Sequence, residues 1–310
     1  MNVLHYHLHE VAPYINWLYF FNAWGFPPRY GNVAQIHDCL SCRAQWIGSF
    51  AEDEKQKAHE AMRLYDEALA MLREMDGKIQ THAIVGLFEA NGDGEDIVLY
   101  NEELRKKYEE CRLPLLRQQH GEECLCWADF LLPIESGKRD TVGLFVTSVD
   151  EEMVNAKSSD NNEHDDYRHL LSQTLADRLA EATAERMHEE VRRSIWGYAK
   201  DEHINIEEMF QEKYIGRRPA VGYPSLPDQS LNFLIDEILD YGRIGVHLTE
   251  SGAMRPHAST SGLLFAHPKA RHFAIGHIGE DQLKDYARRR GMPEDTMRRF
   301  LAANLLKVEN

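Results

Sequence analysis

The segment Arg217-Arg-Pro-Ala-Val-Gly-Tyr-Pro-Ser-Leu-Pro227 is the most informative stretch of this 310-residue chain. Its prolines lack a backbone N–H and fix φ, so the segment is predicted to be ordered but non-helical. Gly222 permits a close approach of the backbone to a neighbour. The guanidinium groups of Arg217 and Arg218 are suited to hold a carboxylate or phosphate through parallel hydrogen bonds. From the residue types alone, a ligand-binding strip and a rigid connection with surface ion pairs are equally compatible with this segment.

Helices and hairpins are predicted on both sides of this strip. Apolar residues recur at helical spacing over 52–75 and 167–195, which predicts two long helices. Two β-type runs flank Asn91-Gly-Asp-Gly94, as expected for a hairpin formed by residues 83–88 and 96–100. Further elements are predicted as a strand pair at 127–132 and 141–146, a polar surface connection at 150–166, helices at 207–213, 228–240 and 281–290, and strands at 262–265 and 272–278. Because strict β-α-β order is missing, the predicted class is α+β in one extended domain.

The composition excludes several classes of protein. Hydrophobic residues make up 43% and charged residues 28%, close to the averages of globular domains, so a disordered or collagen-like chain is excluded. The 35 basic and 51 acidic residues give a net charge of −16, which disfavours nucleic acid because phosphate contacts need clustered Lys and Arg. No apolar run approaches the roughly 20 residues that cross a bilayer, and no leader peptide opens the chain. We therefore expect a cytoplasmic protein without a membrane or nucleic-acid partner.

Cysteines and histidines give two weak signals for metal binding. Five cysteines are an odd number in a long chain, which favours reduced thiols. Cys39-Leu-Ser-Cys42 is a lone C-x-x-C, so idle thiols are favoured over a metal or redox site. His5, His7 and His9 would share one face of a strand and are a possible ligand set. Because a flexible His-containing terminus is the default expectation for residues 1–9, we predict no metal site.

Two other segments have open interpretations. The hydroxyl-rich segment 249–262 is typical of loops that line a site and equally typical of a simple corner. Residues 269–290 hold six basic side chains against three acids, in an otherwise acidic chain. Such a patch can steer an acidic partner, although a solvated helix face is the commoner explanation. Dinucleotide, Walker, serine-hydrolase and zinc-protease motifs are absent from the sequence, which counts modestly against those activities.

A series of short motifs resembles the activation domain of cobalamin-dependent methionine synthase. The strongest matches are Arg218-Pro-Ala-Val-Gly-Tyr-Pro224, Leu175-Ala-Asp-Arg-Leu-Ala-Glu-Ala182 and Trp196-Gly-Tyr-Ala199. Shorter matches are Tyr14-Ile-Asn-Trp17 with Phe20-Phe21, Val85-Gly-Leu-Phe88, Leu116-Arg-Gln-Gln119, Ala128-Asp-Phe130, His164-Asp-Asp-Tyr167, Ser261-Gly262, His267-Pro268 and Asp285-Tyr-Ala-Arg288. Together they run in family order from about residue 10 to 306, so the resemblance covers nearly the whole chain.

The resemblance implies a fold and a function. The fold is a C-shaped α+β domain spanning residues 1–310, with a central twisted antiparallel sheet and flanking helices. The function is a reactivation module that binds S-adenosylmethionine and supplies its methyl group for reductive methylation of inactive cob(II)alamin. The cobalamin is expected on the cobalamin-binding part of methionine synthase, as a partner chain or domain, and the electron is expected from flavodoxin or a similar reductase.

The resemblance also implies a set of ligand-binding residues, with no catalytic or metal-binding residue among them. Arg218 corresponds to the family arginine that holds the methionyl carboxylate, and Ala220 to the residue whose backbone contacts the ligand. Tyr223 completes the motif and is expected to pack near the adenosine. Glu181 and Glu212 match family acids near the site, although a solvated helix face is about as compatible with either residue.

Two positions depart from the family pattern. Asn16 stands where the family has an aspartate that pairs with the ammonium of the ligand. An amide oxygen accepts that hydrogen bond without charge assistance, so the bond should be weaker. His272 and Phe273 stand where the family has a pair of tyrosines, so aromatic character is kept but a phenol hydroxyl is lost. We therefore expect a changed affinity for S-adenosylmethionine.

Three functions remain open from the sequence: the reactivation module itself, a docking or regulatory protein with weakened ligand binding, and a reactivator of another corrinoid methyltransferase. Nothing in the chain resembles a homocysteine-binding zinc barrel, a folate barrel or the cobalamin-binding Asp-x-His-x-x-Gly loop. We therefore expect a component of methionine synthase, not a complete methyltransferase. A free-standing activator fits slightly better than a piece of a larger enzyme.

Overall fold

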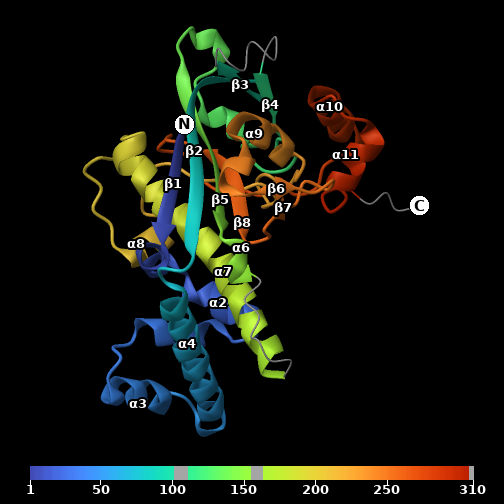
Figure 1. Ribbon diagram of the computed structural model, residues 1–310. Coiled ribbons are helices and arrows are strands. Elements are labelled where there is room, and N and C mark those ends of the chain that lie inside the picture. The colour runs from blue at the N-terminus through green and yellow to red at the C-terminus, as the bar shows by residue number, and fades with distance from the viewer. Residues whose placement is uncertain (101–110, 155–162, 307–310) are drawn as a thin grey trace.

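The centre of the molecule is an antiparallel sheet, seen in a computed structural model that describes residues 1–100, 111–154 and 163–306 (Figure 1). The strand order is β4-β3-β2-β5-β8, and β1 also pairs with β2. The strands are β1 (Asn2–His7), β2 (Gln80–Asp93), β3 (Asp96–Tyr100), β4 (Cys111–Pro114), β5 (Asp140–Val149) and β8 (Ser259–Leu264), with a separate small pair of β6 (His247–Leu248) and β7 (Met254–Arg255). The predicted α+β class with a central antiparallel sheet is confirmed.

Helices cover both faces of the central sheet, and others pack beyond its ends. The helices of the described residues are α1 (Leu8–Val11), α2 (Trp17–Ala23), α3 (Leu40–Gly48), α4 (Lys55–Met75), α6 (Glu151–Val154), α7 (Glu163–Glu190), α8 (Ile206–Phe210), α9 (Leu231–Leu239), α10 (Glu280–Arg290) and α11 (Glu294–Phe300). The two longest, α4 and α7, lie where the helical spacing predicts them, and α7 continues as a π-helical turn over Val191–Ile195. Every helix of the described residues is too short or too polar to cross a lipid bilayer.

The central strands bury side chains on both faces. Val85 and Phe145 belong to a core shared with α4 and α7, whereas the adjacent residues Ile84 and Val146 belong to a second core shared with α9. Successive side chains of a strand point to opposite faces, so a strand that is covered twice must be apolar at nearly every position. This double burial fixes the register of β2 and β5, on which the neighbouring strands depend.

The predicted hairpin is confirmed, but its first strand is longer than the sequence suggests. Asp93 pairs with Asp96 across a tight turn in which Gly94 has a φ of +62°. Strand β2 runs from Gln80 to Asp93 because it serves three neighbours: its first half pairs with β1, its second half pairs with β3, and β5 pairs along its other edge.

Three predicted elements differ in the structure. Residues Trp127–Phe130 form a 3-10 turn instead of a strand, because Asp129 accepts a hydrogen bond from the Cys126 N–H at 2.8 Å and closes the turn. Residues 272–278 run as an irregular segment whose last residue makes a single bridge to the C-terminal region. The predicted connection at 150–166 is mostly helical where described, as α6 from Glu151 and the start of α7, and residues 155–162 lie outside the described part of the chain.

The prediction of a flexible N-terminus over residues 1–9 is wrong. Residues Asn2–His7 form strand β1, which pairs along β2 with Tyr6 opposite Thr81. The residue Tyr6 is 5% exposed, and its hydroxyl donates to Glu190 at 2.9 Å. The free edge of a long strand and a buried position for one ring together order this terminus. The strand ends at His7, so His9 lies in α1 and the three histidines do not share one strand face.

The anchoring of β1 predicts the effect of a substitution at its buried ring. Tyr6→Ala should lower the free energy of unfolding by about 3 kcal/mol, because it leaves a cavity and removes the hydrogen bond to Glu190. Asn2→Ala, at an exposed position of the same strand, should change that free energy by less than about 0.5 kcal/mol. Urea unfolding of both variants provides the measurement, and equal stability of the two would contradict the ordered terminus.

Candidate ligand-binding site

The strip formed by residues 217–227 lies along β8 and extends the sheet irregularly. Arg217 and Phe265 exchange both backbone hydrogen bonds at 2.9 Å, and the Val221 N–H donates to the Ser261 carbonyl at 2.9 Å. The prolines prevent a helix and the backbone pairs with β8 instead, so the prediction of an ordered, non-helical strip is confirmed.

Gly262 of β8 allows this close approach. A Cβ at that position would lie 2.1 Å from the carbonyl oxygen of Pro219 and 2.9 Å from the Cα of Ala220. Both neighbours are backbone atoms, which cannot move aside as a flexible side chain can. Any side chain at position 262 would therefore displace the strip, and with it Arg218 and Ala220.

A cavity of about 710 Å³ lies between the strip, α7, the start of α2 and the end of α8. All eight residues that the resemblance assigns to a ligand site line this one cavity: Asn16, Glu181, Glu212, Arg218, Ala220, Tyr223, His272 and Phe273. A larger hollow of about 1080 Å³ beside α2 and α4 contains only one of these eight, Asn16. The fold thus brings together residues that are separated by more than half of the sequence.

Arg218 is the buried charge of this cavity. Its guanidinium donates to Glu185 Oε1 at 2.8 Å and lies 5.6 Å from the centre of the Phe145 ring. Burial acts to lower the pKa of Arg218, but the charges of Glu185 and Glu181 more than offset it, so the pKa is raised and the group stays charged. Arg218 Nε and Glu185 Oε2 are buried without a hydrogen-bond partner among the described residues. Buried polar groups are normally paired, so a ligand with both charges would satisfy this pair.

The two acids found by resemblance are paired, so neither is a freely solvated side chain. The Tyr223 hydroxyl donates to Glu181 Oε1 at 2.5 Å. Burial and the charge of Glu181 raise the pKa of Tyr223, so the phenol remains a donor. Glu212 lies 3.2 Å from Arg217 and 3.4 Å from His272. These contacts hold both carboxylates at the wall of the cavity.

Asn16 has a structural role in addition to its place in the cavity. It is the N-cap of α2, and its Oδ1 accepts a hydrogen bond from the Leu18 N–H at 3.2 Å. An amide oxygen has two lone pairs, so one acceptor position remains for a ligand. Aspartate is an equally good N-cap, so the capping role alone does not select the amide.

His272 and Phe273 both pack on the buried ring of Trp127. The ring centres of His272 and Trp127 are 5.9 Å apart in an edge-to-face arrangement, and those of Phe273 and Trp127 are 5.0 Å apart. Burial lowers the pKa of His272, and Arg217 and Arg218 lower it further against the opposing effect of Glu212. The imidazole is therefore neutral at neutral pH and adds no positive charge to the cavity.

Sequence reasoning missed several lining residues, of which Glu185 is the most important. It lies one helical turn after Glu181 on α7, and this i,i+4 spacing places both acids on one face of the helix. The spacing to Glu181 is the sequence feature that could have identified Glu185. The other missed residues that line the cavity are Tyr14, Tyr19, Arg178, Ala182, Met209, Phe210, Pro224, Ser225 and Ala274. They come from five separate segments, and only the fold shows that these segments meet.

Comparisons with known proteins agree with this geometry. Residues 7–291 match the family described as "Vitamin B12 dependent methionine synthase, activation domain". Among solved structures, the "Crystal Structure of the MetH Reactivation Domain bound to AdoHcy" is similar, with a TM-score of 0.84 and 36% sequence identity over 99% of this chain and 91% of that chain. The family match covers most of the sequence, and the structural match covers almost all of it. The chain therefore belongs to the family of vitamin B12-dependent methionine synthase activation domains.

Proposed function

We propose that this domain binds S-adenosylmethionine in the cavity lined by Arg218 and Ala220 and presents its methyl group for reductive methylation of cob(II)alamin in methionine synthase. The observation that carries the proposal is the convergence of all eight expected residues on one cavity of about 710 Å³, a volume suited to a small-molecule cofactor. The related MetH domain was solved with AdoHcy, the demethylated form of this ligand.

The chemistry of the ligand matches the groups that line the cavity. Arg218 has a free donor for the methionyl carboxylate. The amide oxygen of Asn16 accepts from the ligand ammonium, and the carboxylates of Glu181 and Glu212 attract the positively charged sulfonium. Tyr223 offers an aromatic face to the adenosine. Bound S-adenosylmethionine supplies the electrophilic methyl group, and the residues of this chain bind and orient it.

The partner in this proposal is the cobalamin-binding part of methionine synthase. The wall formed by Tyr223 and His272 is open to solvent: the residue Tyr223 is 49% exposed, and the His272 side chain is 44% exposed. A methyl group held at this open side of the cavity is accessible to a corrinoid on a docked partner. Flavodoxin or a similar reductase is the proposed electron source.

The basic stretch at 269–290 contributes less to a reductase surface than the sequence suggests. Arg290 is buried against Asp228 at 3.0 Å, and Arg289 is paired with Asp96 at 2.6 Å. Two of the six basic side chains are therefore used inside the fold, whereas Lys269, Arg271, Lys284 and Arg288 are exposed. The proposal of a flavodoxin-type reductase rests on the family and not on this stretch.

Arg218 provides the first test of ligand binding. Arg218→Ala should weaken S-adenosylmethionine binding by at least about 100-fold, because the carboxylate loses its buried, charged donor. Arg218→Lys keeps the charge but not the paired geometry and should bind with intermediate affinity. Isothermal titration calorimetry gives these affinities, and thermal unfolding confirms that the variants fold. Arg168→Ala, which removes an exposed arginine outside the cavity, is the matched control. Wild-type binding no tighter than that of Arg218→Ala would refute the site.

A substitution at Asn16 distinguishes the reactivation module from a docking protein with weakened ligand binding. Asn16→Asp should raise the affinity for S-adenosylmethionine about tenfold, because a carboxylate adds charge assistance to the bond with the ammonium. Asn32→Asp makes the same charge change at an exposed position outside this cavity and should leave binding unchanged. An Asn16→Asp protein with unchanged affinity would show that this position does not limit binding.

Reactivation itself is tested by the spectrum of the cobalt. The domain is mixed with a cob(II)alamin-loaded module of methionine synthase, a reduced flavodoxin and methyl-labelled S-adenosylmethionine. The Co(II) absorption should be lost and the label should move to the corrinoid, at a rate that Arg218→Ala lowers at least tenfold at subsaturating ligand. Transfer only to the corrinoid protein of a different methyltransferase would establish the third function instead.

A further inference from the structure

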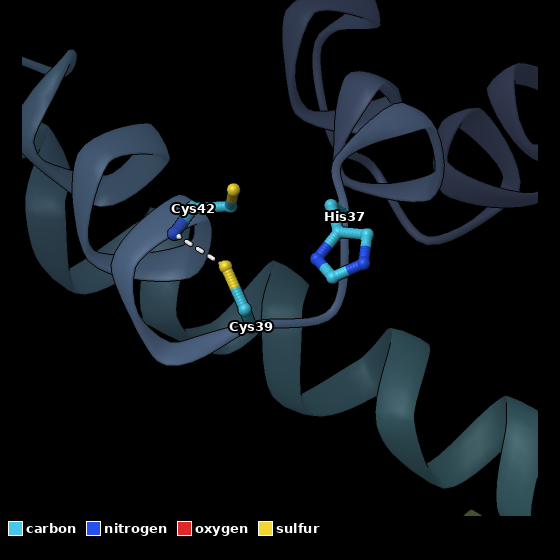
Figure 2. A group of neighbouring side chains, drawn as sticks. All are labelled: His37, Cys39 and Cys42. Atoms are coloured by element: carbon cyan, nitrogen blue, oxygen red, sulfur yellow. Dashed lines mark hydrogen bonds between the residues drawn. The ribbon is translucent and has the colours of Figure 1, made fainter.

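Three side chains with metal-ligating atoms meet at the start of α3: His37, Cys39 and Cys42 (Figure 2). One imidazole nitrogen and two sulfur atoms all lie within 4.8 Å of one another. In the part of the chain that the structure describes, this is the one group of three or more His, Cys, Asp or Glu residues with such spacing. None of the three lines the ligand cavity.

The local backbone explains why these side chains converge. Cys39 is the N-cap of α3, and its Sγ accepts a hydrogen bond from the Cys42 N–H at 3.3 Å. A side chain at the N-cap folds back over the first helical turn, so the two sulfur atoms lie on the same side of the helix start. The Cys39 N–H donates to the His37 carbonyl at 2.9 Å, a short turn that places the imidazole beside the two thiols.

The environment of the thiols suits a metal ligand. Both cysteines are free and half-buried, and His37 is exposed, so an ion from solution can reach them. The thiolate is the form that binds metals, and both thiols are close enough to the imidazole to share one ion.

The donor set selects the kind of ion. Thiolate and imidazole are the ligands of zinc, whereas magnesium and calcium require oxygen ligands. The lone C-x-x-C was insufficient evidence for a metal in the sequence, because two ligands do not define a site. His37, two residues before Cys39, offers a third ligating atom, and the turn before α3 places it beside the cysteines.

We propose that His37, Cys39 and Cys42 bind one zinc ion through three protein ligands, with the fourth position open to water or an exogenous ligand. When zinc binds, any thiol that is still protonated releases its proton to the solvent, and the imidazole binds in its neutral form. The exchange involves protons only, so no electron is transferred. The site lies at the end of the molecule that holds α3 and α4, away from the strands β3 and β4 (Figure 1). It would fix the turn before α3 against the helix.

The test uses the full chain without an affinity tag, reduced and freed of metal by a chelator. Zinc titration should give one equivalent bound, and Co²⁺ should give a thiolate-to-cobalt charge-transfer band together with the visible bands of tetrahedral cobalt. Cys39→Ser should weaken zinc binding by at least about tenfold, because it removes a ligating thiolate. Serine is itself a preferred N-cap, so this variant keeps the cap of α3 and should remain folded.

Two more variants define the site. The double variant Cys39→Ser/Cys42→Ser should lose the charge-transfer band, and His37→Gln should weaken zinc binding while keeping the band. Cys124→Ser removes a half-buried thiol elsewhere and should change neither measurement. Wild-type protein that binds no zinc in the reduced state, or a double variant that keeps the charge-transfer band, would overturn the proposal. S-Adenosylmethionine binding should be the same in Cys39→Ser and wild type, so this result is independent of the proposed function.

Discussion

The close contact between the strip 217–227 and Gly262 is the constraint on which the ligand cavity depends. The strip lies so near β8 that a single Cβ at position 262 would meet backbone atoms on two residues. Strand β8 is in turn fixed by β5, where Phe145 is buried directly across from Gly262. The guanidinium of Arg218 lies over that phenylalanine ring. The register between β5 and β8 therefore sets the position of the Arg218 guanidinium in the cavity, because it places Gly262, which has no side chain, against the strip.

Arg218 and Glu185 form an ion pair in which each side chain has a buried polar atom with no partner among the described residues. Leaving such a group unpaired costs about 1–3 kcal/mol. A simple anion would satisfy Arg218 but would add repulsion against Glu185. An amino-acid ligand supplies a carboxylate for the arginine and an ammonium for the acidic side of the cavity. The pair thus favours a zwitterionic group over an anion of the same size.

The sequence predicts those parts of the structure that local pattern determines. The spacing of apolar residues locates α4 and α7, and the turn residues before Gly94 locate the hairpin. It fails where a distant partner decides the outcome. Residues 1–9 have no strong pattern of their own, and they are ordered because β2 offers them an edge. The Trp127 region has the composition of a strand, but Asp129 closes it into a turn. In the cavity, the resemblance found Glu181, and Glu185 was missed although it lies on the same helical face.

In the proposed site, the departures at Asn16 and His272 bear on how the cavity would discriminate between S-adenosylmethionine and the product of methyl transfer. The lining side chains include three carboxylates, Glu181, Glu185 and Glu212, and two guanidinium groups, Arg178 and Arg218. Arg217 lies outside the lining but is paired with Glu212, so the charges of this wall balance, and the neutral His272 adds none. S-Adenosylmethionine carries one net positive charge, and the product formed when the methyl leaves carries none. An aspartate at position 16 would add a negative charge that attracts the methyl donor more than the product. The asparagine adds no such charge, so the preference for the methyl donor is weaker than an aspartate would give.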